Sequence, residues 1–198
     1  MNDKYLDVVG RVVLDAEKLR AEFFAGAGPA LVAAAEAMAA SLQNGGKLML
    51  FGNGGSAADA QHIAAEFVNK LDGPRAPLAA LALTTDTSAL TAIANDSSYD
   101  DVFARQLAAL GRRGDVAVGI TTSGNSASVL AALRRAGEMG LTTVGLLGRD
   151  GGKAEKLCRH ALVVRHASTQ RVQEVHSMIG HILVELVELR LFGGGERA

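Results

Sequence analysis

Two glycine-rich loops, each between a short apolar run and a helical pattern, constrain this chain more than any other feature. The first is Gly-Asn-Gly-Gly-Ser at residues 52–56, and the second is Thr-Thr-Ser-Gly-Asn-Ser at residues 121–126. Small residues let an anion approach the backbone, and the start of the following helix favours negative charge. One such loop is weak evidence, because glycine and asparagine also form ordinary turns. Two loops in the same strand–loop–helix setting indicate paired phosphate-binding loops.

Helical and apolar-run patterns alternate along the chain, which predicts its fold class. Helices are expected at residues 3–24, 29–42, 57–69, 88–94, 101–110, 129–139 and 168–191, and buried strands at 48–51, 78–83, 116–120, 143–147 and 161–164. The alternation predicts a single α/β domain with a doubly wound parallel sheet of about five strands, a flavodoxin-like three-layer sandwich. Both glycine loops then lie at the carboxyl ends of strands, where such sheets bind ligands. We expect the α/β core at residues 47–192 and the helices within 3–43 to pack between subunits.

Composition is that of a cytoplasmic enzyme rather than a membrane or nucleic-acid-binding protein. The 198 residues carry a net charge of −1, and apolar residues make up 48% of the chain while aromatic residues make up only 4%. The single cysteine, Cys158, has no partner for an internal disulfide and suits a reducing compartment. No signal peptide is predicted, and the longest apolar stretches are too short or too interrupted to predict a membrane span.

A second group of polar residues has the chemistry of a metal site. His62 and Glu66 are four residues apart and share a helix face, and the last predicted helix carries Gln173 and His181. One carboxylate, one amide and two imidazoles suit zinc or a similar divalent ion. From spacing alone, a surface pair at His62 and Glu66 and a satisfied core histidine at His181 remain equally open. Asp59 is read as an exposed helix residue, and His176 has no assigned role.

Five segments, in the same order along the chain, resemble the bacterial phosphoheptose isomerases, a family of the sugar isomerase (SIS) superfamily. They are residues 52–67, 95–103, 121–129, 148–153 and 171–188. The resemblance implies one zinc per subunit, held by His62, Glu66, Gln173 and His181. It also implies a homotetramer with active sites at subunit interfaces, and a sugar-phosphate substrate contacted by Asn53, Gly54, Gly55, Ser56, Glu66, Asn95, Asp96, Thr121, Thr122, Ser123, Ser126 and Gln173. The Asn95-Asp96 pair would otherwise read as a turn or cap. Two positions depart from the family pattern, Thr121 in place of serine and Gln170 where some members have aspartate.

The implied reaction converts sedoheptulose 7-phosphate to D-glycero-D-manno-heptose 7-phosphate, the first step toward ADP-heptose or GDP-heptose. Glu66 is the candidate base and His181 the partner acid, while zinc would polarise the carbonyl. Two alternatives stay open. A non-catalytic SIS protein that binds the replication initiator DnaA would have altered metal and catalytic positions, and a sugar-phosphate sensor would carry a DNA-binding extension. The sequence leaves open whether the product serves lipopolysaccharide, a capsule or an S-layer glycan.

Overall fold

A computed structural model describes residues 2–71 and 73–193. Its strands are β1 (Leu48–Gly52), β2 (Ala80–Ala82), β3 (Val116–Thr121), β4 (Thr142–Gly148) and β5 (His160–Val164). The α-helices are α1 (Asn2–Gln43), α2 (Gly55–Val68), α3 (Thr87–Asp96), α4 (Val102–Leu110), α5 (Ala127–Glu138) and α6 (Thr169–Phe192), with short 3-10 turns η1 (Tyr99–Asp101) and η2 (Glu155–Leu157).

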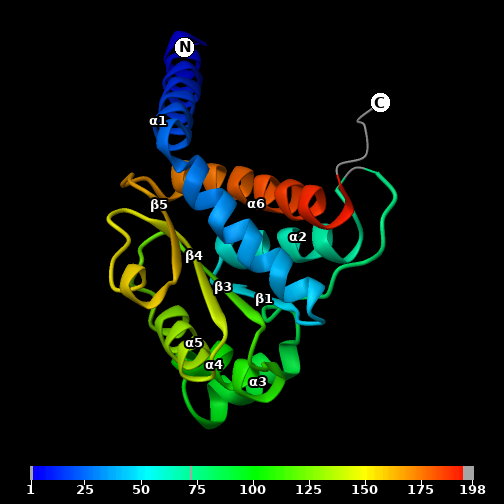
Figure 1. Ribbon diagram of the computed structural model, residues 1–198. Helices are drawn as coiled ribbons and strands as arrows, with labels where there is room; N and C mark the ends of the chain where they lie inside the picture. Colours follow the sequence, from blue (N-terminus) through cyan, green and yellow to red (C-terminus); the bar gives the residue numbers. More distant parts are fainter. Residues whose placement is uncertain (1, 72, 194–198) are drawn as a thin grey trace.

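The described strands form one parallel sheet in the order β2-β1-β3-β4-β5, between two layers of helices (Figure 1). Strand β1 is apolar throughout because its successive side chains point to opposite faces of the sheet, and each face is covered by its own hydrophobic core. Leu48 and Leu50 join the core under α1, α2 and α6, whereas Met49 and Phe51 join the core that includes residues of α4 and α5. The predicted α/β class and five-stranded parallel sheet are confirmed.

Helix α1 corrects one prediction, since it is a single 42-residue helix rather than two. The Gly-Ala-Gly-Pro sequence at residues 26–29 suggested a break, because Pro29 lacks an N–H and clashes with the preceding turn. Packing outweighs this local signal. After Pro29 the helix buries Leu31, Met38 and other residues against the sheet, while its first part stands away from the sheet (Figure 1).

By length and composition, α1 is also apolar enough to cross a membrane, contrary to the sequence expectation. A single helix of this kind is weak evidence, because core helices of globular proteins share these properties. The second half of α1 packs against the sheet as a core helix does. Its first half exposes apolar side chains, including Leu6 (61%), Val9 (58%) and Leu14 (65%).

Helices α2 and α6 lie together on one face of the sheet and run in the same direction (Figure 1). Gly180 permits their close approach, because a Cβ atom there would lie 2.6 Å from Cδ1 and Cγ1 of Ile63. The helices meet through Gly55 and Gln173 near their starts and through His62 and His181 further along. Residues far apart in the sequence are thereby brought together in a fixed register.

Candidate active site

The two glycine loops lie side by side, because β1 and β3 are neighbours in the sheet. Gly52 pairs with Ile120, so the two strands end at the same edge. Strand β2 lies on the other side of β1, which makes this the point where strand order reverses. The chain then leaves β1 for α2 on one face and β3 for α5 on the other. This position in the sheet is the usual ligand site of doubly wound folds.

The side chain of Asn53 joins the two loops directly. Its Nδ2 donates to Ser126 Oγ at 2.7 Å and to Ser128 Oγ at 2.9 Å. Its Oδ1 accepts a hydrogen bond from the Tyr99 hydroxyl at 2.9 Å. The amide is therefore oriented by three hydrogen bonds, and it fixes the spacing of the loops before any ligand binds.

The second loop is supported from outside by the segment 148–153. Gly124 has φ +65°, and a Cβ atom there would lie 2.2 Å from the carbonyl oxygen of Gly151, so a side chain does not fit. Asn125 Oδ1 accepts from the backbone N–H of Lys153 at 3.2 Å. Ser123 Oγ lies 3.3 Å from Thr121 Oγ1. The loop is held rigidly while the Ser123 and Ser126 side chains stay partly exposed.

His62, Glu66 and His181 form a compact cluster in which each offers one ligand atom, all within 4.8 Å of one another. His62 Nε2 lies 3.0 Å from His181 Nε2 and 3.5 Å from Glu66 Oε1. Tetrahedral zinc with nitrogen and oxygen ligands near 2.1 Å separates its ligand atoms by about 3.4 Å. The observed separations and the ligand types therefore fit a zinc ion. His62 and Glu66 keep 50% and 26% of their side-chain surface exposed, which leaves the cluster accessible.

Gln173, the fourth predicted ligand, lies against the first turn of α2. A Cβ atom at Gly55 would be 2.2 Å from Gln173 Nε2, so the glycine makes room for this amide. Gln173 thus lies at the first glycine loop, on the same pair of helices as the His62–Glu66–His181 cluster. Its role as a ligand remains a prediction.

Other predicted residues are less connected to the loops. Asn95 donates to the Asp96 carboxylate at 2.8 Å, and both are exposed at the end of α3. In the described chain no hydrogen bond joins this pair to either glycine loop. Gln170 accepts a hydrogen bond from the Ser168 hydroxyl at 2.9 Å.

The prediction that Asp59 is exposed is wrong, because its side chain is half-buried and its Oδ2 has no hydrogen-bond partner in the described chain. Burial raises the Asp59 pKa, and the neighbouring His62 partly opposes this.

His176 on α6 is fully buried. Neither ring nitrogen has a hydrogen bond of normal geometry, although the ring lies near the Leu147 backbone. Burial lowers the pKa of His176 to about 4, with the Leu147 backbone opposing the shift. The imidazole is therefore neutral at physiological pH.

Two cavities lie away from this chemistry. One of about 410 Å³ lies between α1 and β5, and another of about 430 Å³ lies beside the edge strand β2. Both are lined mainly by apolar side chains and contain none of the predicted ligands. We therefore assign the site from the convergence of polar groups at the strand ends and along α2 and α6, not from cavity size.

Sequence reasoning missed several residues of the site region. Tyr99 and Ser128 lie within the family-like segments 95–103 and 121–129, and only their contacts with Asn53 distinguish them. Arg75 follows α2 in an irregular segment, and Glu188 is one of several acidic residues on α6. No periodicity or motif marks the Arg75–Glu188 pair, so the sequence carried no signal for it.

Comparison with known proteins agrees with this geometry. The SIS domain family profile matches residues 14–148. The phosphoheptose isomerase of Desulfovibrio desulfuricans is 53% identical over 192 residues, covering 97% of this chain and 91% of the relative. That of Aquifex aeolicus is 46% identical over 183 residues, covering 92% and 96% of the two chains. The structure of the Neisseria gonorrhoeae phosphoheptose isomerase superposes with a TM-score of 0.88 at 44% identity, covering 93% of this chain and 98% of that one.

The fold and the paired loops define an SIS-domain protein of the sugar-phosphate isomerase class. The chain belongs to the SIS domain family and, within it, to the phosphoheptose isomerase family. The predicted enzyme class, an isomerase acting on a sugar phosphate, is confirmed.

Proposed function

We propose that this protein converts sedoheptulose 7-phosphate to D-glycero-D-manno-heptose 7-phosphate. The observation that carries the proposal is the convergence of His62, Glu66 and His181 beside two phosphate-type loops. The names of the relatives support the substrate class. A non-catalytic SIS protein that binds DnaA is disfavoured, because the acid–base pair Glu66 and His181 is present.

The two loops would bind the substrate and its phosphate. Backbone N–H groups at the starts of α2 and α5 favour an anion, and the hydroxyls near them add donors. Phosphate binding far from the reacting carbons supplies positioning energy rather than chemistry. The proposed contacts are Asn53, Gly54, Gly55, Ser56, Glu66, Asn95, Asp96, Thr121, Thr122, Ser123, Ser126 and Gln173.

Glu66 and His181 are the proposed catalytic residues. Moving the carbonyl from C2 to C1 requires removal of one proton from C1 and return of one proton to C2, through an enediol. A Glu66 carboxylate oxygen accepts the C1 proton, and the His181 imidazole donates at C2 while protons exchange between the two substrate oxygens. Their ligand atoms lie within 4.8 Å of each other, so both can reach adjacent carbons of one substrate.

The same cluster would hold one zinc ion per subunit. The proposed ligands are His62, Glu66, Gln173 and His181, a set of nitrogen and oxygen donors that suits zinc. Because an atom bound to the ion cannot transfer a proton at the same time, Glu66 and His181 would change their coordination during turnover. When bound, the ion supplies Lewis acidity at the substrate carbonyl. The 3.0 Å and 3.5 Å separations between ligand atoms support this assignment.

The proposal extends to assembly and cellular role. We propose a cytoplasmic homotetramer with active sites at subunit interfaces, acting in the first step of heptose precursor synthesis and needing no nucleic acid or membrane. The exposed apolar side chains of Leu6, Val9 and Leu14 on α1 support self-association. Closed symmetry would bury the same face of each subunit.

The decisive experiment incubates purified protein with sedoheptulose 7-phosphate and zinc and follows the aldose product. We expect turnover by the wild-type protein and none above background by the Glu66→Gln variant. Absence of product from zinc-loaded, folded wild-type protein would contradict the proposal. Equal turnover by the two proteins would remove Glu66 from the reaction.

A further inference from the structure

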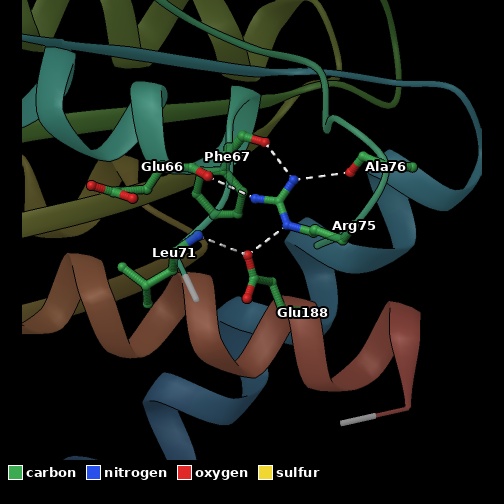
Figure 2. A network of polar contacts seen from close by, with 6 residues as sticks. All are labelled: Glu66, Phe67, Leu71, Arg75, Ala76 and Glu188. Carbon is green, nitrogen blue, oxygen red and sulfur yellow. Dashed lines mark hydrogen bonds and ion pairs between the residues drawn. The ribbon is translucent and has the colours of Figure 1, made fainter. Parts of the chain in front are cut away.

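Helix α2 ends at a buried ion pair that joins it to α6 (Figure 2). Arg75 Nε lies 2.5 Å from Oε1 of Glu188, and their side chains are only 4% and 18% exposed. The same oxygen accepts from the backbone N–H of Leu71 at 3.3 Å. Water therefore screens the pair weakly, and removing one partner leaves the other buried without its counter-charge.

The remaining N–H groups of Arg75 cap the last turn of α2. Nη2 donates to the backbone carbonyl of Glu66 at 2.6 Å, and Nη1 donates to those of Phe67 at 2.9 Å and Ala76 at 3.0 Å. Carbonyls in a final turn lack partners within the helix, and a cation there interacts favourably with the helix dipole. One guanidinium therefore both completes α2 and fastens it to α6.

The residue capped in this way is the proposed base. Figure 2 shows the Glu66 carbonyl facing Arg75 while its carboxylate points away from Arg75. Arg75 thus fixes the backbone from which the carboxylate extends. Glu188 lies seven residues beyond His181 on α6, about 10 Å along the helix. The pair therefore lies close to the His62–Glu66–His181 cluster in the fold without joining it.

We propose that Arg75 and Glu188 are positioning residues for the isomerisation, holding the end of α2 on α6 so that Glu66 stays within reach of His181. This inference rests on the proposed roles of Glu66 and His181. We call the Arg75–Glu188 ion pair, with the backbone contacts of Arg75, the clamp. The glycine loops lie at the opposite end of α2 and do not depend on the clamp. Loosening it should therefore lower turnover at saturation and weaken metal binding, with little change in the half-saturating substrate concentration.

Two conservative variants test the clamp. Arg75→Lys keeps the positive charge but loses the fork that serves several acceptors at once. Glu188→Gln keeps the shape and an acceptor oxygen but loses the charge. A matched control is the pair Lys47 and Asp115, 2.6 Å apart with 25% and 4% exposure. Lys47 directly precedes β1 and Asp115 directly precedes β3, at the amino ends of these strands and opposite the glycine loops. Lys47→Gln therefore removes an ion pair without changing α2 or α6.

Each variant is measured for kcat, KM, thermal unfolding and zinc affinity by competition with a chelator. We expect Arg75→Lys and Glu188→Gln each to lower kcat and zinc affinity by about 10- to 100-fold, as for other residues that orient metal ligands. Lys47→Gln should lower the unfolding temperature while leaving kcat and zinc affinity unchanged. The zinc measurement reports the geometry of the cluster independently of turnover.

Wild-type kcat and zinc affinity in folded Arg75→Lys and Glu188→Gln would overturn the inference and leave the pair with a stabilising role only. If Arg75→Lys does not fold, Glu188→Gln decides, and a failure of both to fold would likewise overturn a positioning role. The assay includes Glu66→Gln to separate the two proposals. Activity retained by Glu66→Gln contradicts the proposed role of Glu66, on which the inference rests. Loss of activity in Glu66→Gln, with wild-type kcat and zinc affinity in Arg75→Lys and Glu188→Gln, contradicts only the inference.

Discussion

Nε2 of His62 and Nε2 of His181 lie 3.0 Å apart although 119 residues separate them in the chain. The two rings meet edge to face, with centroids 5.0 Å apart. One ring nitrogen must donate and the other accept, or both must bind a shared cation. Because Glu66 completes the group, this contact is the structural basis for the predictions on catalysis and metal binding.

Substitution of Glu66 or His181 should remove the reaction and leave the fold intact. Glu66→Gln and His181→Gln each delete a proton-transfer group with little change in volume, and we expect turnover to fall by at least about 10²- to 10⁴-fold. Turnover and circular dichroism are measured together. Glu138→Gln, an exposed change on α5, is the control and should behave as wild type. Near wild-type turnover by either site variant would show that its residue is neither acid nor base.

Purified protein should bind about one zinc per subunit, as expected for a site with two histidines and one carboxylate. His62→Gln should weaken zinc binding by removing a nitrogen ligand, and a strong chelator should abolish turnover until zinc is restored. Elemental analysis and chelator titration measure this. His160→Gln, at the start of β5, should bind zinc normally. Full activity in excess chelator, with no metal detected, would contradict a metal role.

Loss of a loop hydroxyl should impair substrate binding more than chemistry. Ser56→Ala and Ser123→Ala each remove one donor while the backbone N–H groups remain, so we expect a cost of about 1–3 kcal/mol per lost contact with a charged group. Steady-state kinetics should show the loss chiefly in KM. A large fall in kcat at unchanged KM would place these serines at the reacting carbons instead.

The buried His176 should make stability depend on pH. Its pKa is about 4 in the folded protein, below the ordinary value of 6.5, so the unfolded chain binds the extra proton between these values. The stability is fully present above about pH 6.5 and falls as pH decreases toward 4, by about 3 kcal/mol at most. Urea unfolding at a fixed protein concentration measures it. His176→Leu should flatten this part of the pH profile, and an unchanged profile would exclude His176 as the cause.

The protein should form a homotetramer, with a mass by light scattering of about four times the 20.5 kDa subunit. Substituting exposed apolar residues of α1, such as Leu6→Lys with Val9→Lys, should dissociate it, because these side chains are largely exposed in one subunit and a charge would be buried at the interface. A mass of one subunit for the wild-type protein would contradict the prediction.

Mixing inactive Glu66→Gln and His181→Gln subunits tests how the sites are shared. Both residues lie within one cluster of a single chain, so we expect no activity to return from the mixture. Recovery of activity would show that these two residues act across a subunit boundary. Other residues at the proposed interfaces can be compared in the same way.

Sequence patterns predicted the fold well because the decisive signals are local. Parallel strands buried on both faces produce continuous apolar runs such as residues 116–120. A glycine loop directly after such a run lies at the carboxyl end of the strand, where ligands bind. The two-helix interpretation of residues 3–42 was wrong for the converse reason. Gly26, Gly28 and Pro29 are strong local breakers, yet burial of the following turns maintains α1.

The site was only partly predictable, because its contacts are long-range. His62 and Glu66 share a helix face by spacing alone, but nothing local places His181 beside them, and the family resemblance supplied that expectation. Asp59 was misread because its place on a helix does not by itself show that its side chain is half-buried. Arg75 and Glu188 lie 113 residues apart and were not predicted at all. Their partnership depends on the parallel packing of α2 and α6, which the sequence does not display.

The position of α2 also has a consequence for substrate length. The helix starts at Gly55 in the first glycine loop and carries His62 about 10 Å further along its axis, at about 1.5 Å per residue. A ligand whose phosphate rests at the helix start must span that distance to reach the cluster. A seven-carbon chain phosphorylated at its far end has this reach, whereas a triose phosphate does not. In the proposed complex, the spacing between the first turn of α2 and His62 would therefore favour longer sugar phosphates over shorter ones.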